Sequence, residues 1–185
     1  MLTLAKEVHA IRELEIPDGI DIKIDGKKIK VKGPKGELER DFSHIKDLSL
    51  RLEDKKLIAE VYFADAKKKA VVGTVIAHVK NMITGVTKGY RYKLKIIYSH
   101  YPISVKKDGN KIIISNFIGE KSPRIAKVFP GVNVKVQGTD IILEGIDIEK
   151  VSQSAANIEL ATKISDFDRR KFMDGIYIYS REVIE

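Results

Sequence analysis

Apolar and polar residues alternate through several short stretches of this 185-residue chain, and two of these stretches resemble each other. Residues 20–38 (IDIKIDGKKIKVKGPKGEL) align with residues 103–122 (ISVKKDGNKIIISNFIGEKS), and Gly26 matches Gly109 at a shift of 83. In both copies, alternating segments flank an Asp-Gly turn, which is the strongest short-range signal for a β-hairpin. The chain is therefore predicted to contain an internal repeat that begins with strands.

The similarity continues downstream. Residues 48–61 (LSLRLEDKKLIAEV) match residues 132–145 (VNVKVQGTDIILEG), and both segments alternate around a polar turn. This pattern predicts a further pair of strands in each copy.

Each copy then ends in a segment with helical periodicity. Residues 66–83 place a set of apolar side chains on one helix face, and Gly85 is expected to end that helix. The set comprises Val71, Val72, Val75, Ile76, Val79, Met82 and Ile83. Residues 148–164 have a narrower apolar face, and Asp147 is expected to be the N-cap of this second helix.

The pattern of several strands followed by one helix occurs twice, and it predicts an α+β fold made of two tandem duplicated small domains. Each domain is expected to be a mostly antiparallel sheet packed against one helix. The expected domains are residues 1–85 and residues 86–185, with a linker near Gly85 and Gly89.

Basic and aromatic residues alternate in residues 88–101 (KGYRYKLKIIYSHY), and strand geometry separates them onto two faces. One face carries Tyr90, Tyr92, Leu94, Ile96 and Tyr98, and the other carries Arg91, Lys93, Lys95 and Ile97. Because the tyrosines lie with leucine and isoleucine, we expect them to join the core and not to stack on bases. The basic face is either a solvated strand surface or a row of phosphate contacts.

The charge distribution favours the second interpretation. The net charge is +8, and residues 88–135 contain eleven lysines and arginines but only two acids, Asp108 and Glu120. This segment carries +9, so the rest of the chain is close to neutral. Like charges without nearby partners repel one another, and a polyanion would relieve that repulsion.

Catalytic and metal-binding patterns are not visible in the sequence. There is no cysteine, the four histidines have no ligand spacing, and neither HExxH nor GxSxG occurs. We therefore expect no enzyme activity, no cofactor and no metal site. No apolar run approaches the roughly 18 residues of a membrane span, and the start resembles no signal peptide, so we expect a cytoplasmic protein without membrane contact.

Longer motifs resemble one known family, the large-subunit ribosomal protein L-six family. They are residues 71–103 (VVGTVIAHVKNMITGVTKGYRYKLKIIYSHYPI), 116–121 (NFIGEK), 129–132 (FPGV), 143–159 (LEGIDIEKVSQSAANIE) and 168–178 (DRRKFMDGIYI). The last motif is similar to the archaeal and eukaryotic branch, the eukaryotic L-nine type. In the bacterial branch it is replaced by a loop of Pro-Tyr-Lys-Gly-Lys-Gly type.

The resemblance implies a structural protein of the large ribosomal subunit that binds large-subunit rRNA, chiefly through its C-terminal domain. It also implies a position near the stalk base and the sarcin-ricin loop, where it would support the translation-factor binding region. The expected partners are this rRNA and neighbouring ribosomal proteins, with those of the stalk base among the candidates. The chain itself is expected to be a monomer within the ribosome. The expected RNA contacts are Lys88, Arg91, Lys93, Lys95, Lys121, Arg124, Lys127, Arg169, Arg170 and Lys171.

Two alternatives remain open. One is an adaptor outside the ribosome that binds RNA or an acidic protein partner through the basic strand. The other is an enzyme acting on RNA, which would need a cofactor loop or a poised acid-base pair.

Overall fold

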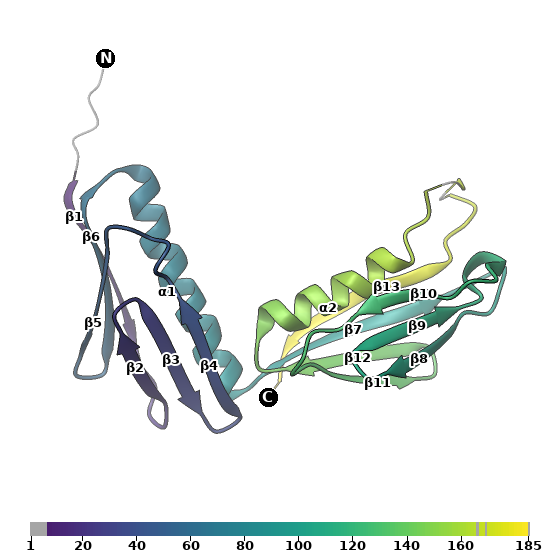
Figure 1. The fold of residues 1–185 in the computed structure, drawn as a ribbon, viewed down its shortest axis with the longest axis horizontal. Helices are drawn as coiled ribbons and strands as arrows, with labels where there is room; N and C mark the ends of the chain where they lie inside the picture. The colour runs from purple at the N-terminus through teal and green to yellow at the C-terminus, as the bar shows by residue number, and fades with distance from the viewer. Residues whose placement is uncertain (1–6, 166, 169, 185) are drawn as a thin grey trace, which may run out of the picture. The chain divides into compact units, whose positions relative to one another are not determined.

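The computed structural model describes residues 7–165, 167–168 and 170–184 (Figure 1). The chain divides into two compact units, residues 1–87 (unit 1) and residues 88–185 (unit 2), each with its own hydrophobic core. Each unit combines antiparallel sheets with one α-helix, so the expected α+β class with two tandem duplicated domains is confirmed.

Unit 1 contains two three-stranded antiparallel sheets and a long helix. One sheet has the order β1 (Glu7–Glu15), β6 (Lys56–Ala64) and β5 (Leu48–Glu53). The other has the order β2 (Asp21–Asp25), β3 (Lys28–Gly33) and β4 (Gly36–Asp41). Helix α1 (Ala66–Thr87) packs against strands of both sheets.

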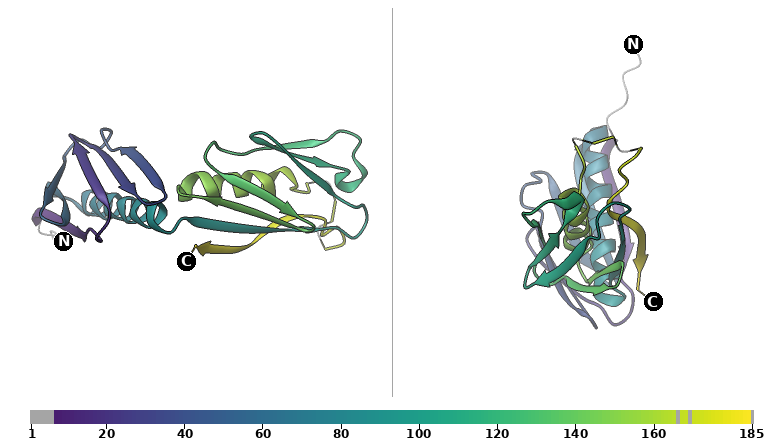
Figure 2. Two further views of the ribbon diagram at one scale, coloured as in Figure 1. Left: turned by 90° about the horizontal axis from the view of Figure 1, so that it is seen from below. Right: turned by 90° about the vertical axis from the view of Figure 1, so that its right-hand side faces the viewer.

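Unit 2 contains a four-stranded and a three-stranded antiparallel sheet. The larger has the order β11 (Asn133–Gln137), β12 (Asp140–Gly145), β7 (Tyr90–Ile97) and β13 (Gly175–Val183). The smaller has the order β10 (Arg124–Lys127), β9 (Lys111–Ser115) and β8 (Ser104–Asp108), with the 3-10 helix η1 (Phe117–Gly119) before β10. Helix α2 (Ile148–Ala161) runs along the core face of the larger sheet and also contacts β10 (Figure 2).

The expectation of one sheet per domain is wrong, because each unit has two. In both units the first three strands of the repeat form a meander, and the next hairpin pairs with a strand that precedes the meander, β1 or β7. Alternating patterns identify strands, but they do not specify which strands pair over long distances. Strands β1 and β13 were not expected at all.

The tight turns show the repeat in the backbone. Gly26 and Gly109, which align in the sequence, have φ of 59° and 54°. Asp54 and Gly138 occupy the equivalent turns before β6 and β12, with φ of 51° and 59°. Positive φ favours glycine, so the Asp-Gly turns of the first hairpins reflect a conformational requirement.

Both helices differ in length from their expected extents. Gly85 does not end α1, because it and Val86 are buried in the core and the helix continues to Thr87. The chain turns instead at Gly89, which has φ of 84°. Helix α2 ends at Ala161, and its expected N-cap is confirmed: the Asp147 carboxylate accepts a hydrogen bond from the backbone nitrogen of Glu149 at 3.0 Å.

By length and composition alone, α1 could cross a membrane. Its buried face instead lies in the core of unit 1, where Val72, Val79 and Val86 are fully buried beside Leu57 and Ala59 of β6. These contacts are those of a core helix in a globular domain.

The close approach of β3 to the end of α1 leads to a stability prediction. A Cβ atom at Gly33 would lie 2.6 Å from Val86 Cγ2 and 3.0 Å from the Val86 carbonyl oxygen. Gly33→Ala should therefore destabilise unit 1 by about 1–3 kcal/mol, the usual cost of overpacking. Gly73→Ala in α1 is the control, because nothing lies within 4 Å of its added Cβ, and it should leave stability unchanged or raise it by up to about 1 kcal/mol. Urea unfolding followed by circular dichroism measures both, and equal effects would contradict the prediction.

Candidate nucleic-acid interface

The basic row of β7 projects from the outer face of the four-stranded sheet, and acidic residues from neighbouring strands neutralise it. Arg91 Nε lies 2.7 Å from Glu144 Oε1, and Lys95 Nζ lies 2.9 Å from Asp140 Oδ2, both on β12. Lys93 Nζ lies 2.9 Å from Glu182 Oε1 on β13. The predicted RNA contacts Arg91, Lys93 and Lys95 are thus each engaged in an ion pair, which RNA phosphates would have to replace.

The pKa values of these acids are consistent with the pairing. The hydrogen bond from Arg91 lowers the pKa of Glu144, and partial burial opposes it. The hydrogen bond from Lys95 likewise lowers the pKa of Asp140, which also accepts from the Tyr179 hydroxyl at 3.1 Å. Hydrogen bonds from Ser180 and then from Lys93 lower the pKa of Glu182. All three carboxylates are therefore ionised near neutral pH.

The opposite face of β7 enters the core, as the alternation predicted. Tyr90, Leu94 and Ile96 are buried, and Tyr92 packs partly buried against the same core. Tyr98 differs, because it lies just beyond the end of β7 and is exposed. Burial of Tyr90 removes it from any base-stacking surface.

Arg124 is held by contacts within unit 2. Its guanidinium forms two hydrogen bonds to the Glu120 carboxylate, at 2.6 and 2.9 Å, and lies 4.3 Å from the centre of the Phe117 ring. Nη1 also donates to the carbonyl oxygens of Ala161 and Lys163 at 2.9 and 3.2 Å, and so satisfies groups at the C-terminal end of α2. This predicted RNA contact therefore has a structural role.

The remaining predicted contacts are more exposed. Lys121 and Lys127 are exposed, and neither forms an ion pair with a residue that the structure describes. Lys88 lies two residues before the start of β7 and is exposed. Lys171 is also exposed, in the loop before β13.

Of the basic triplet in this loop, Arg169 lies outside the described residues. The Arg170 side chain is 92% exposed, and its Nε lies 3.2 Å from Asp168 Oδ1. The hydrogen bonds from the backbone and then the side chain of Arg170 lower the pKa of Asp168. An ion pair this exposed contributes little to stability, so Arg170 can readily exchange its partner for a phosphate.

Sequence reasoning did not select the lysines on β8 and β9 of the three-stranded sheet of unit 2. Residues 104–127 contain six basic and two acidic residues, and Lys106, Lys107 and Lys111 on β8 and β9 are exposed. None of these three forms an ion pair with a described residue. The sequence favours β7 instead, because the acids that pair with its basic row are 45 to 89 residues away in the chain and close only in the folded structure.

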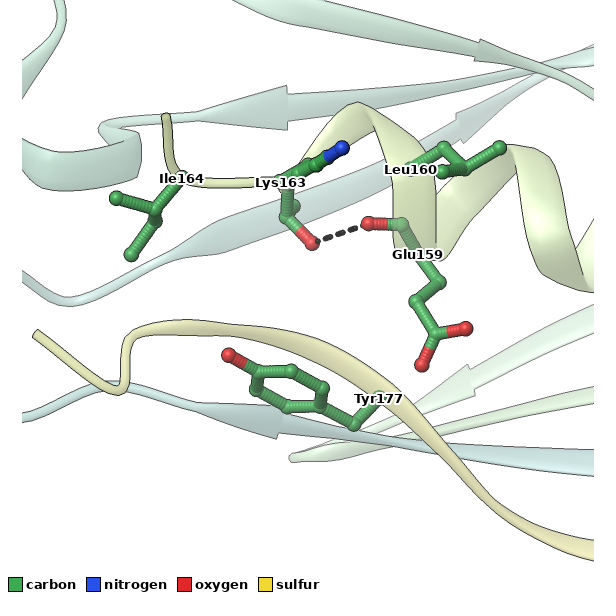
Figure 3. Close-up of a pocket in the computed structure, with 6 residues that line it drawn as sticks. Glu159, Leu160, Lys163, Ile164 and Tyr177 are labelled. Carbon is green, nitrogen blue, oxygen red and sulfur yellow. Dashed lines mark hydrogen bonds between the residues drawn. The ribbon is translucent and has the colours of Figure 1, made fainter. Parts of the chain in front are cut away.

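A cavity of about 270 Å³ lies between the end of α2 and β13 (Figure 3). Its polar groups hold the two elements together: Glu159 Oε1 accepts from the backbone nitrogen of Ile178 at 3.1 Å, and Thr162 Oγ1 accepts from that of Ile176 at 2.9 Å. Tyr177 borders the cavity from β13 and donates to the Met173 carbonyl. This cavity is part of the packing of unit 2. Within the described part of the chain, no group of His, Cys, Asp or Glu is arranged to hold a metal ion.

Asp174 anchors the basic loop to the rest of unit 2. Its side chain is 1% exposed, and its carboxylate accepts from the backbone nitrogens of Ser99 and His100 at 2.8 and 3.1 Å and pairs with His100 Nδ1 at 2.7 Å. Burial would raise the pKa of Asp174, but these hydrogen bonds outweigh burial and lower it to about 2. The start of β13 is thereby fixed beside the end of β7.

This pKa predicts a pH dependence of stability. Because the folded-state pKa lies below the unfolded value of 3.8, the ionised Asp174 should stabilise unit 2 above about pH 4. That contribution, roughly 2 kcal/mol, should be lost as the pH falls toward 2. Asp174→Asn should lower stability at pH 7 by a similar amount and flatten this part of the profile, in urea unfolding measured from pH 7 to 2. Asp108→Asn, at an exposed aspartate, should keep the wild-type profile; a steep profile in Asp174→Asn would contradict the assignment.

Comparison with known proteins agrees with this architecture. The sequence model of the family Ribosomal protein L6 matches residues 16–89, nearly all of them in unit 1, and residues 101–175 in unit 2. Large ribosomal subunit protein uL6 of Aeropyrum pernix is 60% identical over 98% of this chain and 100% of its own length. The uL6 protein of Ignicoccus hospitalis is 62% identical over 96% of each chain, and that of Sulfurisphaera tokodaii is 62% identical over 97% of this chain and 96% of its own. The chain belongs to the ribosomal protein L6 family, in the archaeal and eukaryotic branch that its motifs indicated.

Proposed function

We propose that this chain is a structural constituent of the large ribosomal subunit and binds large-subunit rRNA. The observation that carries the proposal is identity of 60–62%, over nearly the full length, to proteins named for that subunit. The chain is accordingly a ribosomal protein of the cytoplasm and not an enzyme. Its partners are rRNA and neighbouring ribosomal proteins.

The proposal includes a division of labour between the units, with unit 2 as the main RNA-binding part. Exposed lysines without an ion pair to a described residue gather on and beside the β10-β9-β8 sheet, namely Lys106, Lys107, Lys111, Lys121 and Lys127. In the corresponding sheet of unit 1, Lys30 is paired with Glu39 at 2.8 Å and Lys28 with Asp41 at 3.9 Å. Phosphates are therefore attracted more strongly to the sheet of unit 2.

The chemistry of RNA determines how these lysines act. A-form helices bury their major groove, so a protein of this kind binds phosphates, 2′-hydroxyls and shape, and not base sequence. Each lysine that contacts a phosphate displaces condensed counterions, and affinity therefore falls as salt rises. On this proposal, Arg91, Lys93 and Lys95 contribute after exchanging their carboxylate partners, whereas Lys106, Lys107 and Lys121 need no such exchange.

The salt dependence tests this arrangement. The full chain should bind transcribed large-subunit rRNA in filter binding, and replacing Lys106, Lys107 and Lys121 by alanine should reduce the slope of log affinity against log salt by about three. Alanine at Lys23 and Lys32 of unit 1, which are also exposed and unpaired among the described residues, should change the slope much less. Equal losses for both sets would reject the division of labour, and failure of the wild-type chain to bind would reject the proposed function.

The finer position near the stalk base and the sarcin-ricin loop rests on the family resemblance. It can be tested cleanly because the chain has no cysteine, so one introduced thiol takes a label at one site. A hydroxyl-radical source attached through Lys121→Cys should cleave rRNA at the sarcin-ricin loop or the stalk base in reconstituted large subunits. The same source attached through Lys23→Cys in unit 1 is the control. Cleavage from residue 121 confined to other rRNA regions would reject this position.

A further inference from the structure

The duplication allows the two units to be compared position by position at one end of their three-stranded sheets. In unit 1 the Phe42 nitrogen donates to the Lys27 carbonyl oxygen at 2.9 Å, and in unit 2 the Val128 nitrogen donates to the Asn110 carbonyl oxygen at 2.9 Å. Since Lys27 and Asn110 differ by the repeat shift of 83, the two closures are equivalent. The cross-strand pair just inside each closure is therefore also equivalent.

This cross-strand pair has opposite charges in unit 1 and like charges in unit 2. In unit 1 it is Lys28 and Asp41, whose Nζ and Oδ2 atoms lie 3.9 Å apart. In unit 2 it is Lys111 and Lys127. Like charges directly opposite on antiparallel strands destabilise a sheet. Asp108 is the cross-strand neighbour of Lys111 on β8, but the two form no ion pair, and neither lysine is paired with another described residue.

An aromatic side chain lies next to this lysine pair. Phe129 follows Val128 where unit 1 has Ser43, and its side chain is 41% exposed with no ring partner among the described residues. Its backbone is held in place, because the Phe129 nitrogen donates to Ser154 Oγ at 3.0 Å and Asn157 Nδ2 donates to the Lys127 carbonyl oxygen at 3.0 Å. Both partners are on α2, so the ring is presented from a rigid support.

The two lysines and the phenylalanine line one cavity of about 300 Å³, with Asn110, Val128 and Pro130 completing its wall. We propose that this Lys111–Lys127 pocket binds a single unpaired nucleotide of the RNA, an inference that rests on the proposed function. Its phosphate lies between the two ammonium groups, and its base stacks on Phe129. Proteins commonly hold unstacked bases on aromatic side chains, and a phosphate supplies the charge that the lysine pair lacks.

The composition of the pocket favours a nucleotide over an acidic peptide. A carboxylate would compensate the lysines but would leave Phe129, Val128 and Pro130 uncovered. A nucleotide has both a negative group and a flat apolar face, and it fits a cavity of this size. The pocket therefore contacts one splayed base, in addition to the phosphate contacts proposed for the rest of the sheet.

The test uses the full chain and two probes that differ only in their bases, hexaadenylate and an abasic hexamer with the same phosphates. Hexaadenylate should shift the Phe129 ring resonances in NMR spectra. Phe129→Ala should weaken its binding about tenfold and leave the abasic probe unaffected, whereas Phe129→Tyr should retain binding. Lys111→Ala with Lys127→Ala should weaken the binding of both probes and reduce the salt slope by about one, because the pair contacts one phosphate. Lys28→Ala, at the equivalent position in unit 1, is the matched control and should change neither the affinity for the two probes nor the salt slope.

Several results would overturn this inference. One is that the Phe129 ring resonances do not shift at millimolar hexaadenylate, and another is that the two probes bind with equal affinity. A third is that hexaglutamate displaces hexaadenylate and shifts the Phe129 ring resonances in the same way. The last would identify a site for acidic protein segments. If the chain still binds transcribed rRNA in these cases, only the pocket assignment fails; if it binds no rRNA, the proposed function fails with it. Because Phe129 is partly exposed, folding of its variants is verified by circular dichroism.

Discussion

Strand β7 is hydrogen-bonded along both edges, to β12 on one side and β13 on the other, and the arrangement of unit 2 depends on this pairing. It determines which side chains of β7 enter the core, so Leu94 and Ile96 are buried while the basic row faces outward. It also brings acids to that row from as far as 89 residues away in the chain. In the folded chain the basic residues of β7 are therefore paired with acids, and lysines without an ion pair to a described residue lie on the sheet formed by β8, β9 and β10.

The two units share one backbone plan but present different surfaces. In the three-stranded sheet of unit 1, Lys28 and Lys30 each form an ion pair with an acid on β4. In unit 2 the acid of one such pair is replaced by Lys127, and the serine two residues later is replaced by Phe129. Lys127 and Lys111 thus lie opposite each other in unit 2 at the position where unit 1 has an ion pair.

Local features of this fold could be predicted from the sequence, whereas long-range pairing could not. The turns at Gly26 and Gly109, the Asp147 N-cap and the burial of Tyr90 all depend on residues close in the chain, and each was predicted. The split into two sheets and the Lys93–Glu182 pair depend on strand partners that the alternating pattern does not specify. For the same reason the sequence predicts unpaired basic residues on β7, where the folded structure places an acid beside each of Arg91, Lys93 and Lys95.

The position of β13 has a consequence for the order of folding. It is the last strand of unit 2 to be synthesised, yet it pairs with β7, the first. Closing so long a loop is entropically costly and slow, and until β13 emerges one edge of β7 remains unpaired. In unit 1 the last strand, β6, likewise pairs with the first, β1, but the loop between them is shorter, residues 16–55 against residues 98–174 in unit 2. Unit 1 can therefore fold during synthesis while unit 2 still awaits its final strand.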